Sequence, residues 1–138
     1  MLSRRKARVV AFQALYEWDL TRAELDKLVE FPWFERKEGM TEDDLLFSRL
    51  LVAGTLENID QIDQLISKQS RNWELKRLNK VDLALLRISV YAIVYQQDIP
   101  SSVTIDEAVE IAREYGSDES FRFINGILDG IRRSLPSS

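Results

Sequence analysis

Hydrophobic residues recur at helical spacing along most of the chain, and the first such segment begins at the N-terminus. It runs from a predicted cap at Ser3 to about Trp18 and is apolar around most of its circumference. A short helix is predicted over residues 22–29. Residues 31–40 hold a proline and a glycine and are predicted to form a loop. The first helix is therefore expected to be largely buried beyond its polar start.

The middle of the chain carries a longer amphipathic pattern. Thr41 is followed three residues later by an acid, which is typical of a capping box at a helix start. Apolar residues then continue at helical spacing to Ile66, so the pattern predicts either one long helix or two helices divided at Gly54. Ser70 is predicted to cap a short helix over residues 73–78.

The segment from Val81 to Tyr95 is almost continuously hydrophobic and predicts the most buried helix, around which the others pack. The next helix is predicted to open with a capping box formed by Thr104 and Glu107, and to end at Tyr115.

The C-terminal region completes the helical pattern. Gly116 is expected at the C′ position, Ser117 is expected to cap a last helix that ends near Arg133, and residues 134–138 are expected to fray. With only 5 Gly and 3 Pro, the chain has few turns and long elements. We therefore predict one all-α domain over residues 1–138 with about seven helices and a weak division near residues 70–80.

Composition removes several classes of function. The chain has no Cys and no His, which excludes disulfides, Cys-ligated metals and His-based acid–base catalysis. No apolar run approaches the ~20 residues of a membrane span, and no secretory signal pattern follows the N-terminus. The acidic clusters at 42–44, 106–110 and 118–119 stand at predicted helix starts, where carboxylates favour the helix dipole. We expect a cytoplasmic protein that is not an enzyme and needs no cofactor.

The charge is unevenly distributed. The net charge is −4, yet residues 1–16 hold four bases and no acid, leaving 15 bases against 23 acids in the remainder. The four bases are Arg4, Arg5, Lys6 and Arg8. This basic arm on an acidic body indicates a polyanion site at one end of the molecule, and the alternative is a merely solvated first helical turn.

Two aromatic residues stand beside cations at the edges of predicted core faces. Phe123 lies about 40° outside the apolar stripe of the last helix and next to Arg122, and Tyr16 shares a sector of the first helix with Arg5. Arginines that bind phosphates and aromatics that stack on bases are the residues that single-stranded RNA recognition uses. The alternative is that these aromatics fill grooves of the core.

Three segments of the chain resemble the bacterial NusB family. They are Ser3-Arg4-Arg5-Lys6-Ala7-Arg8 with Gln13-Ala14-Leu15-Tyr16, Trp73-x-x-x-Arg77-Leu78-x-x-Val81-Asp82-x-Ala84-Leu85-Leu86-Arg87-Ile88, and a C-terminal region with Ile99-Pro100, Ile105-x-Glu107-Ala108, Tyr115-Gly116 and Ser120-x-x-Phe123-Ile124-Asn125-Gly126. The matches stand in the family's order over nearly the whole chain, while residues 20–70 contribute little.

This resemblance implies two packed small helical bundles, here residues 1–70 and 71–138. It also implies a transcription antitermination factor that binds boxA, a short single-stranded RNA element, together with the ribosomal protein NusE. The complex would join RNA polymerase and other Nus factors. By position, Arg4, Arg5, Lys6 and Arg8 would hold RNA phosphates, and Tyr16, Arg122 and Phe123 would lie on the same RNA surface. Asp82 matches a family acid beside the NusE contact.

The chain departs from the family pattern at two positions. Asp106 stands where Asn is expected, and Ala92 stands where many relatives have Glu, which makes the partner surface less well defined than the RNA surface. Some ribosomal RNA methyltransferases carry a similar helical domain, but this chain ends before a catalytic domain. A helical adaptor that binds only proteins remains the competing hypothesis. The free protein is expected to be a monomer or a homodimer, which could cover the basic arm.

Overall fold

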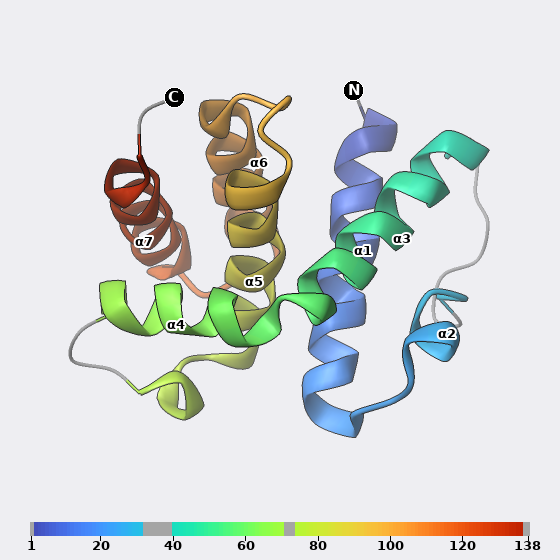
Figure 1. Cartoon of the computed structure of the whole chain (residues 1–138), viewed down its shortest axis with the longest axis horizontal. Helices are drawn as coiled ribbons and strands as arrows, with labels where there is room; N and C mark the ends of the chain where they lie inside the picture. Colours follow the sequence, from blue (N-terminus) through green and yellow to red (C-terminus); the bar gives the residue numbers. More distant parts are fainter. Residues whose placement is uncertain (1, 32–39, 71–73, 137–138) are drawn as a thin grey trace.

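The computed structural model describes residues 2–31, 40–70 and 74–136, and all regular structure in these ranges is helical (Figure 1). The elements are α1 (Leu2–Thr21), α2 (Leu25–Leu28), α3 (Glu42–Glu57), α4 (Ile59–Ser70), the 3-10 helix η1 (Leu75–Arg77), α5 (Lys80–Tyr95), α6 (Ser101–Tyr115) and α7 (Ser120–Ser134). The predicted all-α fold with about seven helices is confirmed. No helix of the described ranges is long and apolar enough to cross a bilayer.

Helix α5 is the centre of the fold, as its hydrophobic sequence predicts. Every residue from 82 to 90 is buried, and α5 packs against α1, α3, α4, α6 and α7. Figure 1 shows α1–α3 on one side of α5 and α6 and α7 on the other. Helix α4 packs against α5 and α7, and the division at residue 70 stays a prediction. Each fully buried Leu or Ile side chain contributes roughly 1.5–3 kcal/mol.

Local hydrogen bonds explain two helix starts. The predicted capping box of α3 is confirmed: the Thr41 hydroxyl accepts from the Asp44 N–H, and the Asp44 carboxylate accepts from the Thr41 N–H, both at 3.1 Å. Asn79, which the sequence analysis missed, caps α5 by accepting from the Val81 N–H at 2.8 Å. Ser70 is the last residue of α4 rather than a cap, so that prediction is wrong.

Of the two predicted alternatives, two separate helices form, but the break lies at Asn58 rather than at Gly54, because α3 continues to Glu57. A side chain at Gly54 would place its Cβ 2.2 Å from Cζ of Tyr91, so glycine is needed for close packing against α5. The Asn58 side chain ends the helix by donating to the Gly54 carbonyl at 2.8 Å.

Several predicted boundaries shift by up to one turn. Helix α1 includes Ser3 and extends to Thr21, and α6 begins at Ser101, so Ser3 and Thr104 are not caps. Ser117 does not cap α7 either, because α7 begins at Ser120 and the residue at its N-cap is Glu119. The Ser117 N–H donates to the Ser120 hydroxyl at 2.9 Å. Parts of the predicted 31–40 loop, the 73–78 helix and the 134–138 tail lie outside the described residues.

Gly116 ends α6 in an extended conformation with φ −95°, rather than in the left-handed conformation that is common at C′. Its lack of a side chain is still required, since a Cβ there would lie 2.6 Å from the Ser120 side chain.

A buried ion-pair network ties α1, α4 and α5 together. Arg87 is only 5% exposed and donates from Nε and Nη2 to the two carboxylate oxygens of Asp63, both at 2.9 Å. Its Nη1 lies 3.6 Å from Asp19, which also pairs with Lys80 at 3.2 Å. The network fixes the C-terminal half of α1 beside the start of α5.

Candidate nucleic-acid interface

The predicted basic arm forms the first turns of α1, which contact α3 through Arg4 and α6 through Arg5 (Figure 1). Arg4 contacts α3: its Nη1 lies 3.3 Å from Asp44 Oδ1, its Nη2 lies 3.3 Å from Asp43 Oδ2, and its Cζ stands 4.2 Å from the ring centre of Phe47. The Arg4 side chain is 41% exposed, so part of its guanidinium faces solvent. Lys6 is exposed on the same turns of α1.

Arg5 is held by α6. Its Nε and Nη2 donate to the two oxygens of Glu107, both at 3.0 Å. These hydrogen bonds lower the pKa of Glu107 and raise the pKa of Arg5, so the pair is charged at neutral pH. Because α6 begins at Ser101, Glu107 lies beyond the first turn and is free to bind Arg5 instead of capping its own helix.

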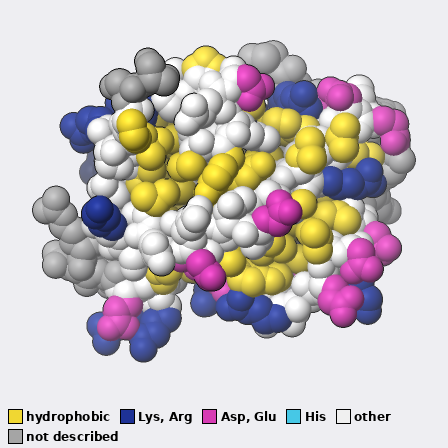
Figure 2. Space-filling view, viewed as in Figure 1, with side chains coloured by type: hydrophobic (Ala, Val, Ile, Leu, Met, Phe, Trp, Pro, Cys, Tyr) yellow, Lys and Arg dark blue, Asp and Glu magenta, His cyan; other side chains and the backbone are white. Residues whose placement is uncertain are grey.

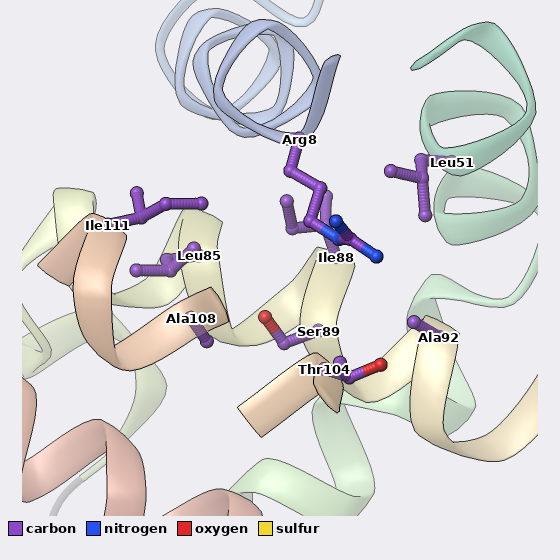
Figure 3. Close-up of a pocket in the computed structure, with 9 residues that line it drawn as sticks. All are labelled: Arg8, Leu51, Leu85, Ile88, Ser89, Ala92, Thr104, Ala108 and Ile111. Carbon is purple, nitrogen blue, oxygen red and sulfur yellow. The ribbon is translucent and has the colours of Figure 1, made fainter. Parts of the chain in front are cut away.

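Arg8 points inward rather than along the surface. Figure 3 shows its guanidinium extending between α1, α3, α5 and α6, into a cavity of about 10 Å³ that is also lined by Leu51, Ser89 and Thr104. Burial lowers the pKa of Arg8, and its carboxylate contact is Glu107 at 3.9 Å. The side chain is 14% exposed, so this geometry does not favour the phosphate contact predicted for Arg8.

Of the three aromatic residues of α1, Phe12 belongs to the core and Tyr16 lies at the surface. Phe12 is buried and packs edge-to-face on Tyr115, with ring centres 5.6 Å apart. Tyr16 is 37% exposed, one turn further along α1. Three residues after Tyr16, Asp19 pairs with Lys80, which places this end of α1 beside the end of α5 that carries Asp82.

Asp82 and Phe123, predicted to serve different partners, line one cleft of about 300 Å³. Phe123 is partly buried and packs against the core, which places its ring at the rim of the core, as its position on the helical wheel predicts. Burial raises the pKa of Asp82, and a hydrogen bond from Ser120 opposes that rise. Its Oδ1 makes no hydrogen bond within the described part of the chain. An unsatisfied buried carboxylate oxygen favours a donor from a binding partner.

Arg122 does not line that cleft. It is exposed, and its Cζ stands 5.6 Å from the ring centre of Phe121, which also lies under Arg113 at 4.1 Å. Phe121 is thus only partly buried, and its ring contacts two arginines. The described residues contain no group of three or more carboxylates that could hold a metal ion.

Two residues of this region, Glu107 and Tyr115, make long-range contacts that local sequence patterns do not predict. Glu107 was interpreted as part of a cap, although its partner Arg5 is 102 positions away. Tyr115 was interpreted only as a helix end, yet it is 40% exposed beside Phe12. Arg5 contacts Glu107 and Phe12 contacts Tyr115, so α1 and α6 run in the same direction and meet through long side chains, which local patterns do not reveal.

Comparisons with known proteins agree with this architecture. Residues 5–133 match the family model described as the NusB family. Transcription antitermination protein NusB of Treponema pallidum (strain Nichols) is 49% identical over 133 residues, which cover 96% of this chain and 94% of the relative. The protein of the same name from Treponema denticola is 44% identical, over 95% of this chain and 96% of the relative.

Solved structures match over similar lengths. T. maritima NusB superimposes with a TM-score of 0.84 at 38% identity, covering 95% of this chain and 91% of that chain. A crystal structure of antitermination factors NusB and NusE in complex with dsRNA matches with a TM-score of 0.81 at 25% identity, covering 98% and 99% of the two chains. The family model, the relatives and the shared fold together show that this chain belongs to the NusB family.

Proposed function

We propose that this chain is a transcription antitermination factor that binds the single-stranded boxA element of ribosomal RNA transcripts together with NusE. The assembly joins RNA polymerase and other Nus factors in the cytoplasm, without catalysis or a cofactor. The family match over residues 5–133 carries this proposal. The cluster of cations at one end of an otherwise acidic chain, with Lys6 exposed and Arg4 and Arg5 partly exposed, supports it independently.

RNA phosphates bind at the start of α1 in this proposal. Arg4, Arg5 and Lys6 present cationic groups there, and Glu107 holds Arg5 in one orientation. Arg8 supports this surface from inside by contacting the same carboxylate. Three phosphate contacts to a single strand give a log–log salt slope of about −2, whereas a fourth contact by Arg8 would bring it to about −3.

Bases and the protein partner bind further along the molecule. Tyr16 and Phe123 offer partly exposed rings for stacking, and Arg122 adds a cation on α7. Asp82, with its unpartnered carboxylate oxygen, accepts a hydrogen bond from NusE. A basic partner offsets the repulsion between RNA and the acidic body, so we expect the pair to bind RNA more tightly than this chain alone.

Substitutions at the two ends test the proposal. Arg4→Ala combined with Arg5→Ala should weaken boxA binding broadly while the melting temperature stays nearly unchanged. Phe123→Ala should cost about 1–3 kcal/mol of RNA binding through lost stacking. Lys27→Ala, at an exposed position on α2, serves as the matched control. Unchanged RNA affinity in the double variant would refute the basic arm as the phosphate site.

The competing function is a helical adaptor that binds only proteins. The carboxylate partners of Arg4 and Arg5 favour it, since an arginine paired within its own chain needs no RNA. An adaptor would bind NusE with no preference for boxA over scrambled RNA.

A further inference from the structure

Arg8 carries its charge into the fold, where no described residue accepts a hydrogen bond from it. A guanidinium has five N–H donors and keeps its proton in proteins. The Arg8 side chain is 14% exposed, and its Nη1 lies 3.9 Å from Glu107 Oε1, which is beyond hydrogen-bond distance. The ring of Phe47 stands 5.2 Å from Arg8 Cζ and offers no oxygen or nitrogen acceptor. The buried guanidinium therefore has donors to offer a ligand.

The charge of Arg8 is not balanced by Glu107. Arg5 already donates to both oxygens of that carboxylate at 3.0 Å. Two cations thus share one anion, which leaves a net charge of +1 on the three groups. Figure 2 shows Lys and Arg side chains of the visible face standing at the surface, several of them beside Asp or Glu. Arg8 has neither full contact with solvent nor a carboxylate of its own.

Two hydroxyl groups lie on the wall of the cavity that Arg8 enters. Figure 3 shows Arg8 extending from α1 toward Ser89 of α5 and Thr104 of α6, both of which line this cavity of about 10 Å³. Ser89 is 5% exposed and Thr104 is 4% exposed. Thr104 Oγ1 makes no hydrogen bond within the described part of the chain. By contrast, the buried hydroxyl of Thr55 donates to the Leu51 carbonyl at 2.6 Å.

The size and chemistry of the cavity limit what it can bind. A volume of about 10 Å³ corresponds to one water-sized sphere, which excludes phosphate and any carboxylic acid. The guanidinium excludes a cation. A water molecule would accept hydrogen bonds but would leave the buried charge uncompensated. The remaining wall is aliphatic and includes Leu85, Ile88 and Ile111. A monatomic anion satisfies the volume, the charge and the donors together.

We propose that the cavity between α1, α5 and α6 binds one chloride ion, held by the Arg8 guanidinium and by the hydroxyl groups of Ser89 and Thr104. The ion accepts hydrogen bonds from three helices that are distant in the sequence and so links their packing. It also keeps Arg8 turned inward, away from the phosphate-binding surface proposed at the start of α1.

Thermal unfolding of the full chain in mixtures of sodium chloride and sodium gluconate, at one constant sodium concentration, tests the proposal. Gluconate is too large for the cavity. Chloride at about ten times its dissociation constant should raise the melting temperature of the wild type by about 5 °C relative to Arg8→Met, which lacks the charge. Thr104→Val preserves the side-chain shape and removes one donor, so it should keep less than about half of that rise.

Thr55→Val is the matched control, because it removes a buried hydroxyl that does not line the cavity. It should keep the full rise, and general salt effects should act alike on both threonine variants. Circular dichroism at low temperature checks that each variant folds. In crystals grown with sodium bromide, the anomalous signal should show a bromide ion between Arg8, Ser89 and Thr104.

Equal responses of Thr104→Val and Thr55→Val to chloride would overturn the proposal, as would a wild type that responds no more than Arg8→Met. Either result would leave water as the occupant of the cavity. A bromide signal found only at surface arginines would also overturn it, since the chloride effect would then arise outside the cavity.

Discussion

Replacing Arg87 with methionine should destabilise the fold strongly, because it breaks a buried network without removing its acids. Arg87 is 5% exposed and both of its hydrogen bonds to Asp63 are 2.9 Å long. The substitution leaves the Asp63 carboxylate without its arginine partner. The Asp19 side chain is 5% exposed and would keep Lys80, at 3.2 Å, as its nearest cation. Removing one partner of a buried pair typically costs about 3–5 kcal/mol. That is a large share of a total stability of about 5–15 kcal/mol.

Urea unfolding followed by circular dichroism measures this cost, with the slope m checked for two-state behaviour. The melting temperature should fall by roughly 10–20 °C. Arg132→Met is the control: its ion pair with Asp129 is on the surface of α7, so its loss should cost less than about 0.5 kcal/mol. A loss below about 1 kcal/mol for Arg87→Met would show instead that the buried network contributes little to the free energy of unfolding.

Three further substitutions test other contacts. Gly54→Ala should cost about 1–3 kcal/mol in urea unfolding because its Cβ meets the Tyr91 ring, and unchanged stability would show that the ring moves aside freely. Glu107→Gln should raise boxA affinity about 2–5-fold in fluorescence anisotropy, because it removes a carboxylate that competes with phosphate for Arg5. Weaker binding would show that Glu107 helps RNA binding by orienting Arg5 more than it hinders binding by competing for it. Asp82→Asn should stabilise the protein at neutral pH. Burial raises the pKa of this carboxyl in the folded protein, so its charged form lowers stability once the pH exceeds the pKa of the carboxyl in the unfolded chain. The stability difference between the variant and the wild type should therefore vanish near about pH 3, where both side chains are neutral. Equal stability of the two proteins at neutral pH would contradict that argument.

Features that depend on neighbours along the chain were predictable from the sequence. The nearly continuous hydrophobic run of α5 identified the central helix, and the Thr41–Asp44 spacing identified the start of α3. Both rest on helical periodicity or on hydrogen bonds within one turn, which a local pattern records completely.

Features that depend on packing between distant helices were not predictable. Gly54 looks like a helix break until Tyr91 is seen to occupy the space of its missing side chain. Glu107 completes a capping pattern on paper, yet it binds Arg5 because α6 starts a turn earlier. The basic arm was correctly located on α1, but only the fold shows that Arg8 points inward while Arg5 remains half exposed.

Fluorescence anisotropy of a labelled boxA RNA, at about 0.1 M salt, measures whether this chain recognises single-stranded boxA. The titration uses this chain with and without NusE, against a scrambled single strand and a boxA duplex. We expect tighter binding to single-stranded boxA than to either control, and a further gain in affinity when NusE is present. No preference for boxA, even with NusE bound, would contradict the antitermination mechanism and leave a protein-only adaptor as the function of this fold.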